Sequence, residues 1–255
     1  MGVAAVLSYL LLGLAAGFAG GLLGVGGGFL MTPVLILLFG MPPHTAVATS
    51  LFAVTMTSMS STLYYARRGM IDYRLGMALE SASVLGAIVG AHTAIALPGS
   101  VIEIAFGLVL GYASIKMALD SGARGGGGGV RGGYRHLWAG IAASFAAGVL
   151  SGMLGIGGGT VKGPIMMLIM DVPVHTAVPT SSFMIGLTAA AGTIVYLAAG
   201  YVDGVAAALL SLGVFAGAQA GGRVAVRMRP RLLRRVFGAV LFIAAVRMIL
   251  RGLGV

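Results

Sequence analysis

Long apolar stretches separated by short polar connections run along almost the whole chain. They predict four helical segments in each half of the sequence, and runs of about 20 such residues are long enough to cross a bilayer. The expected segments lie at about 3–39, 44–66, 74–97 and 100–119, and then at about 136–170, 175–199, 204–226 and 232–250.

The first segment of each half is too long for one ordinary crossing. A helix of about 36 residues would extend roughly 54 Å, whereas the hydrocarbon core is about 30 Å thick. Three glycines interrupt each segment, and a glycine costs about 1 kcal/mol in a helix interior. We therefore predict two helices meeting at a Gly-rich tip, with a proline in the opening turn of the second helix. The residues concerned are Gly26, Gly27, Gly28 and Pro33 in the first half, and Gly157, Gly158, Gly159 and Pro164 in the second.

These two segments belong to an internal repeat. The stretch Gly17–Ser50 matches Gly148–Ser181 without a gap, 131 residues further on, with 16 of 34 pairs identical. Because glycines and prolines stay in register, the same backbone path is expected twice. We divide the chain into an N-terminal repeat at 1–120, a Gly-rich linker at 121–134 and a C-terminal repeat at 135–255. A glycine run of this kind behaves as flexible coil.

Composition places the chain in a membrane. Hydrophobic residues make up 58%, charged residues only 9%, and the mean hydropathy is +1.04, whereas soluble domains carry about 25% charged residues. The net charge of +10 does not indicate nucleic-acid binding, because the arginines cluster in short connections. Without cysteine, the chain has neither disulfides nor thiolate metal ligands.

The positions of the arginines predict the topology. The connections at 66–74 and 226–235 and the linker are rich in arginine and are expected in the cytoplasm, whereas those at 97–100 and 199–204 carry no Lys or Arg. This makes 3–39 and 136–170 re-entrant from opposite faces. The prediction is an all-α polytopic membrane protein of two inverted-topology repeats, each with a Gly-broken re-entrant helix pair plus three transmembrane helices.

Anion chemistry is expected where the two tips approach each other. Helix N-termini bind anions, and interrupted helices at equivalent places of two halves indicate a transport site. Lys162 replaces Met31 of the first copy, so a cation is expected deep in the membrane, unless its side chain snorkels to the surface. For the glycine triplets, close helix packing is the alternative, and we prefer that reading for Gly86–Gly90 and Gly217–Gly221.

Hydroxyl groups follow each tip in the next helix. They could orient an oxyanion, or instead bond to carbonyls of their own helix. Two carboxylates within helices could carry protons in a coupled transporter. The hydroxyl residues are Thr49, Ser50, Thr180 and Ser181, and the carboxylates are Glu80 and Glu103.

The Gly-rich motifs at Gly20–Pro33 and Ser151–Pro164, each followed by Ala-x-x-Thr-Ser at 46–50 and 177–181, resemble the sulfite exporter TauE/SafE family. The resemblance covers nearly the whole chain. It implies an inner-membrane transporter of sulfite, thiosulfate, sulfoacetate or related organosulfonates. Substrate, direction and coupling ion, whether H⁺ or Na⁺, stay open.

The prediction is a secondary transporter of a small sulfur-containing anion, working by alternating access between the halves. The alternatives are a transporter of a different organic anion or cation, and a membrane scaffold. No nucleophile–base pair or metal-spaced cluster indicates an enzyme, a cofactor or a metal. The expected partners are the lipid bilayer and, in a homodimer, a second copy of the chain; nucleic acid is not among them.

Overall fold

In the computed structural model, which describes residues 2–119, 136–225 and 231–254, the described chain is helical and contains no strand. The linker at 121–134 lies outside the described residues. The helices are α1 (Val3–Leu23), α2 (Gly28–Leu37), α3 (Pro43–Ala66), α4 (Tyr73–Ala96), α5 (Gly99–Leu119), α6 (Leu137–Leu154), α7 (Gly159–Leu168), α8 (Val174–Ala198), α9 (Gly204–Ala225) and α10 (Arg231–Gly252). These bounds confirm the predicted segments to within a few residues.

Both long first segments are broken at their glycines, as predicted. In each half, three glycines around the break have positive φ, a conformation that side chains bearing a Cβ rarely adopt. One closes the first helix in the left-handed conformation and another serves as N-cap of the next helix. The residues are Gly24, Gly26 and Gly27 in the first break, and Gly155, Gly157 and Gly158 in the second.

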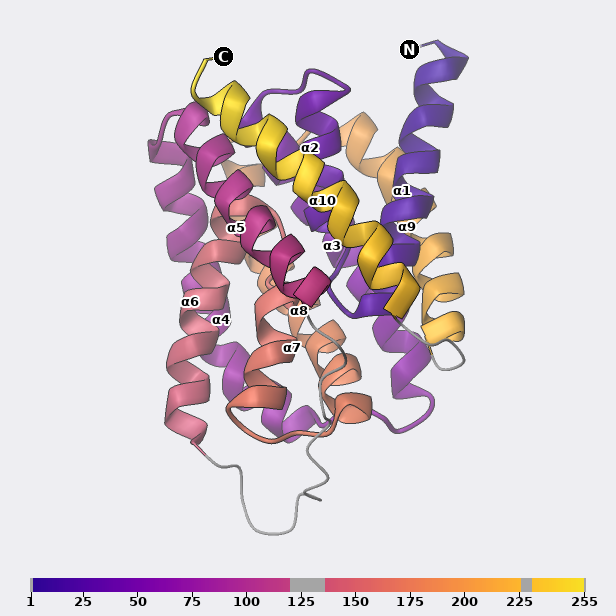
Figure 1. The fold of residues 1–255 in the computed structure, drawn as a ribbon, viewed down its shortest axis with the longest axis vertical. Helices are drawn as coiled ribbons and strands as arrows, with labels where there is room; N and C mark the ends of the chain where they lie inside the picture. The colour runs from indigo at the N-terminus through magenta and orange to yellow at the C-terminus, as the bar shows by residue number, and fades with distance from the viewer. Residues whose placement is uncertain (1, 120–135, 226–230, 255) are drawn as a thin grey trace.

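Equivalent helices of the two halves make equivalent contacts. Helix α1 packs along α9 and α6 packs along α4, while α3 contacts α8 and α5 contacts α10. The first helix of each half thus packs against a helix of the other half. The contacts of the N-terminal half are repeated by the equivalent helices of the C-terminal half. Figure 1 shows α2 near one end of the molecule and α7 near the opposite end. The opposite orientation of the halves in a membrane stays a prediction.

Glycines allow the closest helix pairs. A Cβ on Gly86 would lie 2.3 Å from the Phe145 carbonyl oxygen, and one on Gly217 would lie 2.2 Å from that of Leu14. The helices α4/α6 and α9/α1 therefore meet backbone to backbone. This confirms the packing interpretation of the Gly86–Gly90 and Gly217–Gly221 pairs.

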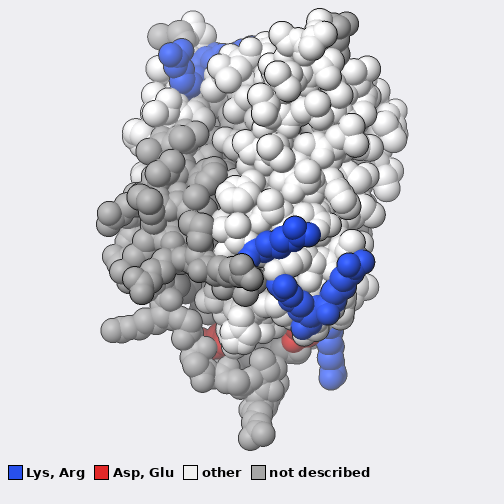
Figure 2. Space-filling model, turned by 90° about the vertical axis from the view of Figure 1, so that its right-hand side faces the viewer, with Lys and Arg blue, Asp and Glu red and all other residues white. Residues whose placement is uncertain are grey.

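Six helices are long and apolar enough to cross a membrane, namely α1, α3, α4, α6, α8 and α9 among the described residues. On length and composition, α1 and α6 thus qualify as full crossings, whereas the sequence prediction assigned them to re-entrant pairs. Figure 2 shows a face with a broad band free of charged side chains, and Lys and Arg gathered towards its ends. Large apolar side chains are exposed on α1 and α9, including Leu7, Leu11 and Leu212.

Candidate functional site

The two Gly-rich tips touch at the centre of the molecule. A Cβ on Gly28 would lie 2.2 Å from the Gly155 carbonyl oxygen, so the two backbones are in direct contact. Val54 of α3 and its repeat equivalent Ile185 of α8 both lie against Gly26 of one tip, and both lie against the equivalent glycine of the other. The predicted proximity of the tips is therefore present, and glycine is required there because the backbones approach so closely.

Two serines that were predicted to orient an anion bond to the tips in this structure. The Ser50 hydroxyl donates to the carbonyl oxygen of Gly155 at 2.9 Å and lies 2.7 Å from the Thr32 hydroxyl. The equivalent Ser181 donates to the Gly24 carbonyl at 3.3 Å. Each serine thus fastens the tip of the opposite half.

The two threonines make a second pair of equivalent contacts. The Thr49 hydroxyl accepts the backbone N–H of Asp203 at 3.2 Å, and the Thr180 hydroxyl accepts that of Asp72 at 3.0 Å. Each aspartate then caps the helix that follows it, through a side-chain bond to the N–H three residues on. These hydroxyls connect one half to the start of a helix in the other.

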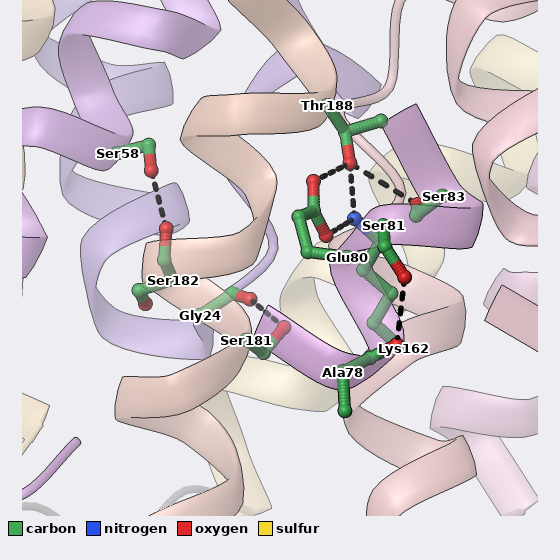
Figure 3. A network of polar contacts seen from close by, with 10 residues as sticks. All are labelled: Gly24, Ser58, Ala78, Glu80, Ser81, Ser83, Lys162, Ser181, Ser182 and Thr188. Atoms are coloured by element: carbon green, nitrogen blue, oxygen red, sulfur yellow. Dashed lines mark hydrogen bonds and ion pairs between the residues drawn. The ribbon is translucent and has the colours of Figure 1, made fainter. Parts of the chain in front are cut away.

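Lys162 is buried with a carboxylate partner. Its side chain is 1% exposed, and its Nζ donates to Oε2 of Glu80 at 2.7 Å. Nζ also donates to the Thr188 hydroxyl, which donates to the other oxygen of Glu80 and lies 3.1 Å from the Ser83 hydroxyl. We call these four residues the Lys162 network (Figure 3). Lys162 therefore does not snorkel to the surface in this structure.

The network gathers residues from three helices: α4 carries Glu80 and Ser83, α7 carries Lys162, and α8 carries Thr188. An isolated charge in a dry interior is very costly, whereas a paired and hydrogen-bonded one is tolerated. The half-helix after the Gly-rich break places Lys162 one turn past the tip, where the carboxylate of α4 can reach it. The site is thus electrically neutral as it stands.

The remaining predicted residues lie apart from this network. Glu103 of α5 is paired with Arg251 of α10, with 3.3 Å between Oε1 and Nε. Arg251 also donates to the Ile36 carbonyl at the end of α2, at 2.6 Å. Pro33 is buried in α2, and Pro164 lies in α7. Of the two predicted proton-carrying carboxylates, only Glu80 meets Lys162.

Two buried hydroxyls on α6 have no hydrogen-bond partner in the structure, those of Ser144 and Ser151. Both belong to the buried face of this helix, which packs on α4. The Ser151 Cβ and the Lys162 Cε each lie 3.3 Å from the point where a Cβ on Gly158 would stand. An unused hydroxyl donor therefore flanks the same part of the tip as the lysine.

The two ends of the molecule differ at equivalent positions. At the start of α3, the ring of His44 stacks on Tyr201 with 5.3 Å between ring centroids, and its Nε2 lies 3.1 Å from two carbonyl oxygens at the end of α4. At the start of α8, the equivalent His175 lines an open cavity of about 480 Å³ with Thr176 and residues 69–73. The two equivalent histidines thus differ in their surroundings: His44 packs against a ring and two carbonyls, whereas His175 lines a surface hollow.

Sequence reasoning missed Thr188, Ser83 and Ser151. The signal that could have found two of them is a break in the repeat, because Ser151 matches Gly20 and Ser83 matches Val214. Thr188 matches Thr57 and carried no such signal. No group of three or more His, Asp or Glu residues that could hold a metal occurs in the described part of the chain.

A helical bundle with six long apolar helices, helices broken at the centre and a buried ion pair defines a polytopic membrane protein. The family described as sulfite exporter TauE/SafE matches residues 9–248. The chain therefore belongs to the TauE/SafE family of membrane transporters.

Relatives cover the chain almost end to end. A probable membrane transporter protein, YunE, of Bacillus subtilis is 29% identical over 95% of this chain and 96% of its own length. The probable membrane transporter protein MJ0441 of Methanocaldococcus jannaschii is 28% identical over 94% of each chain. The sulfite exporter TauE/SafE family protein 3 of Arabidopsis thaliana is 40% identical over 35% of this chain and 19% of its own. No solved structure matches the chain significantly.

Proposed function

We propose that this membrane transporter carries small sulfur-containing anions: sulfite, thiosulfate, sulfoacetate or related organosulfonates. The observation that carries the proposal is Lys162, a fully buried cation beside a helix break in a chain of this family. Ionisable residues inside membrane helices mark substrate and ion pathways. We also propose that the protein lies in the cell inner membrane and acts as a transporter rather than as an enzyme.

The conformational change of transport would follow from the equivalence of the two halves. Two equivalent packings, in which the ends swap their open and closed forms, would give alternating access about a fixed centre. The different surroundings of the equivalent residues His44, which stacks on Tyr201, and His175, which lines a surface hollow, are consistent with two such packings. The hollow lies where α3 ends and α8 begins, at the end that the arginine pattern predicts to face the cytoplasm.

The partner of Lys162 favours a second candidate. Because Glu80 neutralises the lysine, the resting site would also accept a solute without net charge, such as a zwitterionic amino sulfonate. Such a solute could pair its ammonium with Glu80 and its sulfonate with Lys162.

The experiment that separates these candidates is uptake into proteoliposomes. Sulfite, thiosulfate and sulfoacetate are offered one at a time, with taurine as the zwitterion and empty liposomes as the control. Saturable flux of at least one sulfur anion, and none of taurine, supports the anion proposal. Flux of taurine alone would replace it with the zwitterion candidate, and flux of neither by folded protein would remove both.

A further inference from the structure

Apart from Thr188, which matches Thr57, and Glu80, which matches Ser211, the polar side chains of the Lys162 region have no polar counterpart in the equivalent interface of the other half. That interface, formed by α1, α2, α3 and α9, is related to α6, α7, α8 and α4 by the repeat. There Met31, Val214 and two glycines stand in place of polar residues, and the remaining serine bonds to a carbonyl of its own helix. The matched pairs are Lys162 and Met31, Ser83 and Val214, Ser151 and Gly20, Ser144 and Gly13, and Glu80 and Ser211.

This difference indicates one site rather than two. Structural needs that the repeat shares, such as the capping aspartates and the tip-holding serines, are met in both halves. Hydroxyls and charges present on one side alone are not required by the architecture. Burying them is costly, so a function specific to that side is the simplest reason to retain them.

Glu80 occupies the place of an anion. One of its oxygens accepts from Lys162 Nζ at 2.7 Å, and the other accepts from the hydroxyl of Thr188. A sulfonate or sulfite group presents the same chemistry: negatively charged oxygens that accept hydrogen bonds from an ammonium and from hydroxyls. The unpartnered hydroxyl of Ser151, on the same side of the tip, offers one more donor than the carboxylate uses.

We propose that the transported anion binds off the molecular axis, on Lys162, Thr188 and Ser151, by displacing Glu80, and that Glu80 takes up one proton when it is displaced. The proposal rests on the proposed anion transport. The charge balances: the resting site holds Glu80⁻ and Lys162⁺, and the loaded site holds protonated Glu80 and Lys162⁺ paired with a singly charged anion. The proton comes from water on the side from which the anion enters, so anion and proton move together.

Few other groups could take the proton. Of the helices that contact Glu80 or pack on α4, the described part of α6 carries no titratable side chain and α7 carries only Lys162. Helix α8 carries His175 at its first turn and Tyr196 in its last, far along the helix from Thr188 on either side. Glu80 is therefore the carboxylate whose protonation keeps the loaded site neutral.

The test uses methanesulfonate, a single negative charge, with the full chain in proteoliposomes. A trapped dye reports proton entry, radiolabel reports the anion, and binding is measured in detergent across pH. The wild type should carry one proton with each anion, and its affinity should fall about tenfold for each pH unit above the range in which Glu80 is protonated. Anion entry without proton entry would overturn the inference and leave the transport proposal standing. Neither flux nor binding of any sulfur anion would remove both.

Two variants identify the residues. In Glu80→Gln, binding should become independent of pH and tighten about tenfold, and exchange of anion for anion should persist without proton entry. In Ser151→Ala, affinity should fall about tenfold. Ser61→Ala is the matched control, because this buried hydroxyl bonds to a carbonyl of its own helix. Proton entry retained in Glu80→Gln, or equal affinities of the Ser151 and Ser61 variants, would contradict the proposed site.

Discussion

At the residue scale, the same side-chain types serve two purposes that the sequence does not separate. Ser50 and Ser181 follow the tips in both copies and had every feature of anion ligands. In the structure their hydroxyls are committed to carbonyl oxygens of the opposite tip. Ser151 differs from its repeat equivalent Gly20, but no repeated hydroxyl motif marked it as a ligand, and its hydroxyl is buried without a hydrogen-bond partner. The distinction depends on contacts between residues more than 100 positions apart, which local sequence cannot provide.

The role of Ser50 leads to a stability prediction. Ser50→Ala removes the donor to Gly155 and the partner of Thr32, so two buried polar groups lose a bond, at a cost of about 1–3 kcal/mol. Ser181→Ala removes one longer contact and should cost less. Thermal unfolding in detergent measures both, with the exposed Ser8→Ala as control. Equal melting temperatures of the two buried variants would contradict this ranking.

At the scale of the helices, the sequence was most informative. Glycine and proline mark every break that the structure contains, because backbone conformations of positive φ and missing N–H groups are local properties. The predicted ends of the helices are therefore close to the observed ones. The pairing of the helices was not predicted. The pairing depends on which glycine-bearing helix surfaces pack together. The closest pairs, α1 with α9 and α4 with α6, each join helices from different halves.

The close helix contacts lead to a second prediction. In Gly86→Ala the new Cβ would stand 2.3 Å from the Phe145 carbonyl oxygen, so α4 and α6 must separate. We expect a loss of about 1–3 kcal/mol, even though alanine favours the helix. Gly111→Ala in α5 is the control, since its Cβ would meet only Ala245 at 3.9 Å. The melting temperatures of both variants in thermal unfolding measure this loss. A Gly86 variant as stable as the Gly111 variant would refute the backbone-to-backbone contact.

At the scale of the whole molecule, the two halves have equivalent backbones but differ in their buried polar and charged side chains. The two halves share their tips, as the repeat predicts, and the structure shows that they also share their caps and helix pairs. The buried ion pair occurs at one of two equivalent places. Lys162 was identified from the sequence because it replaces Met31, and Glu80 was identified as a possible proton carrier. Their pairing was not predicted, since the two residues lie in different halves.

The orientation of the halves can be tested directly, because the chain has no cysteine. Gly69 and Gly200 are repeat equivalents, both exposed, with open space around their Cα atoms. With inverted halves, Gly200→Cys should react with an impermeant maleimide from outside right-side-out vesicles, and Gly69→Cys only after permeabilisation. Labelling of both from the same side would show that the halves are inserted in parallel.

The most direct measurement is the saturable flux of the transported sulfur anion in Lys162→Met, which installs the residue of the other copy. Arg74→Met, which also replaces a cation by methionine but at an exposed position, is the control. The double variant Lys162→Met with Glu80→Gln removes the pair without leaving an unpaired buried charge. We expect both Lys162 variants to fold and to lose at least about 99% of the flux, since a buried charged contact contributes about 3 kcal/mol. The Arg74 variant should transport normally. Wild-type flux in the folded double variant would show that the anion does not bind at Lys162.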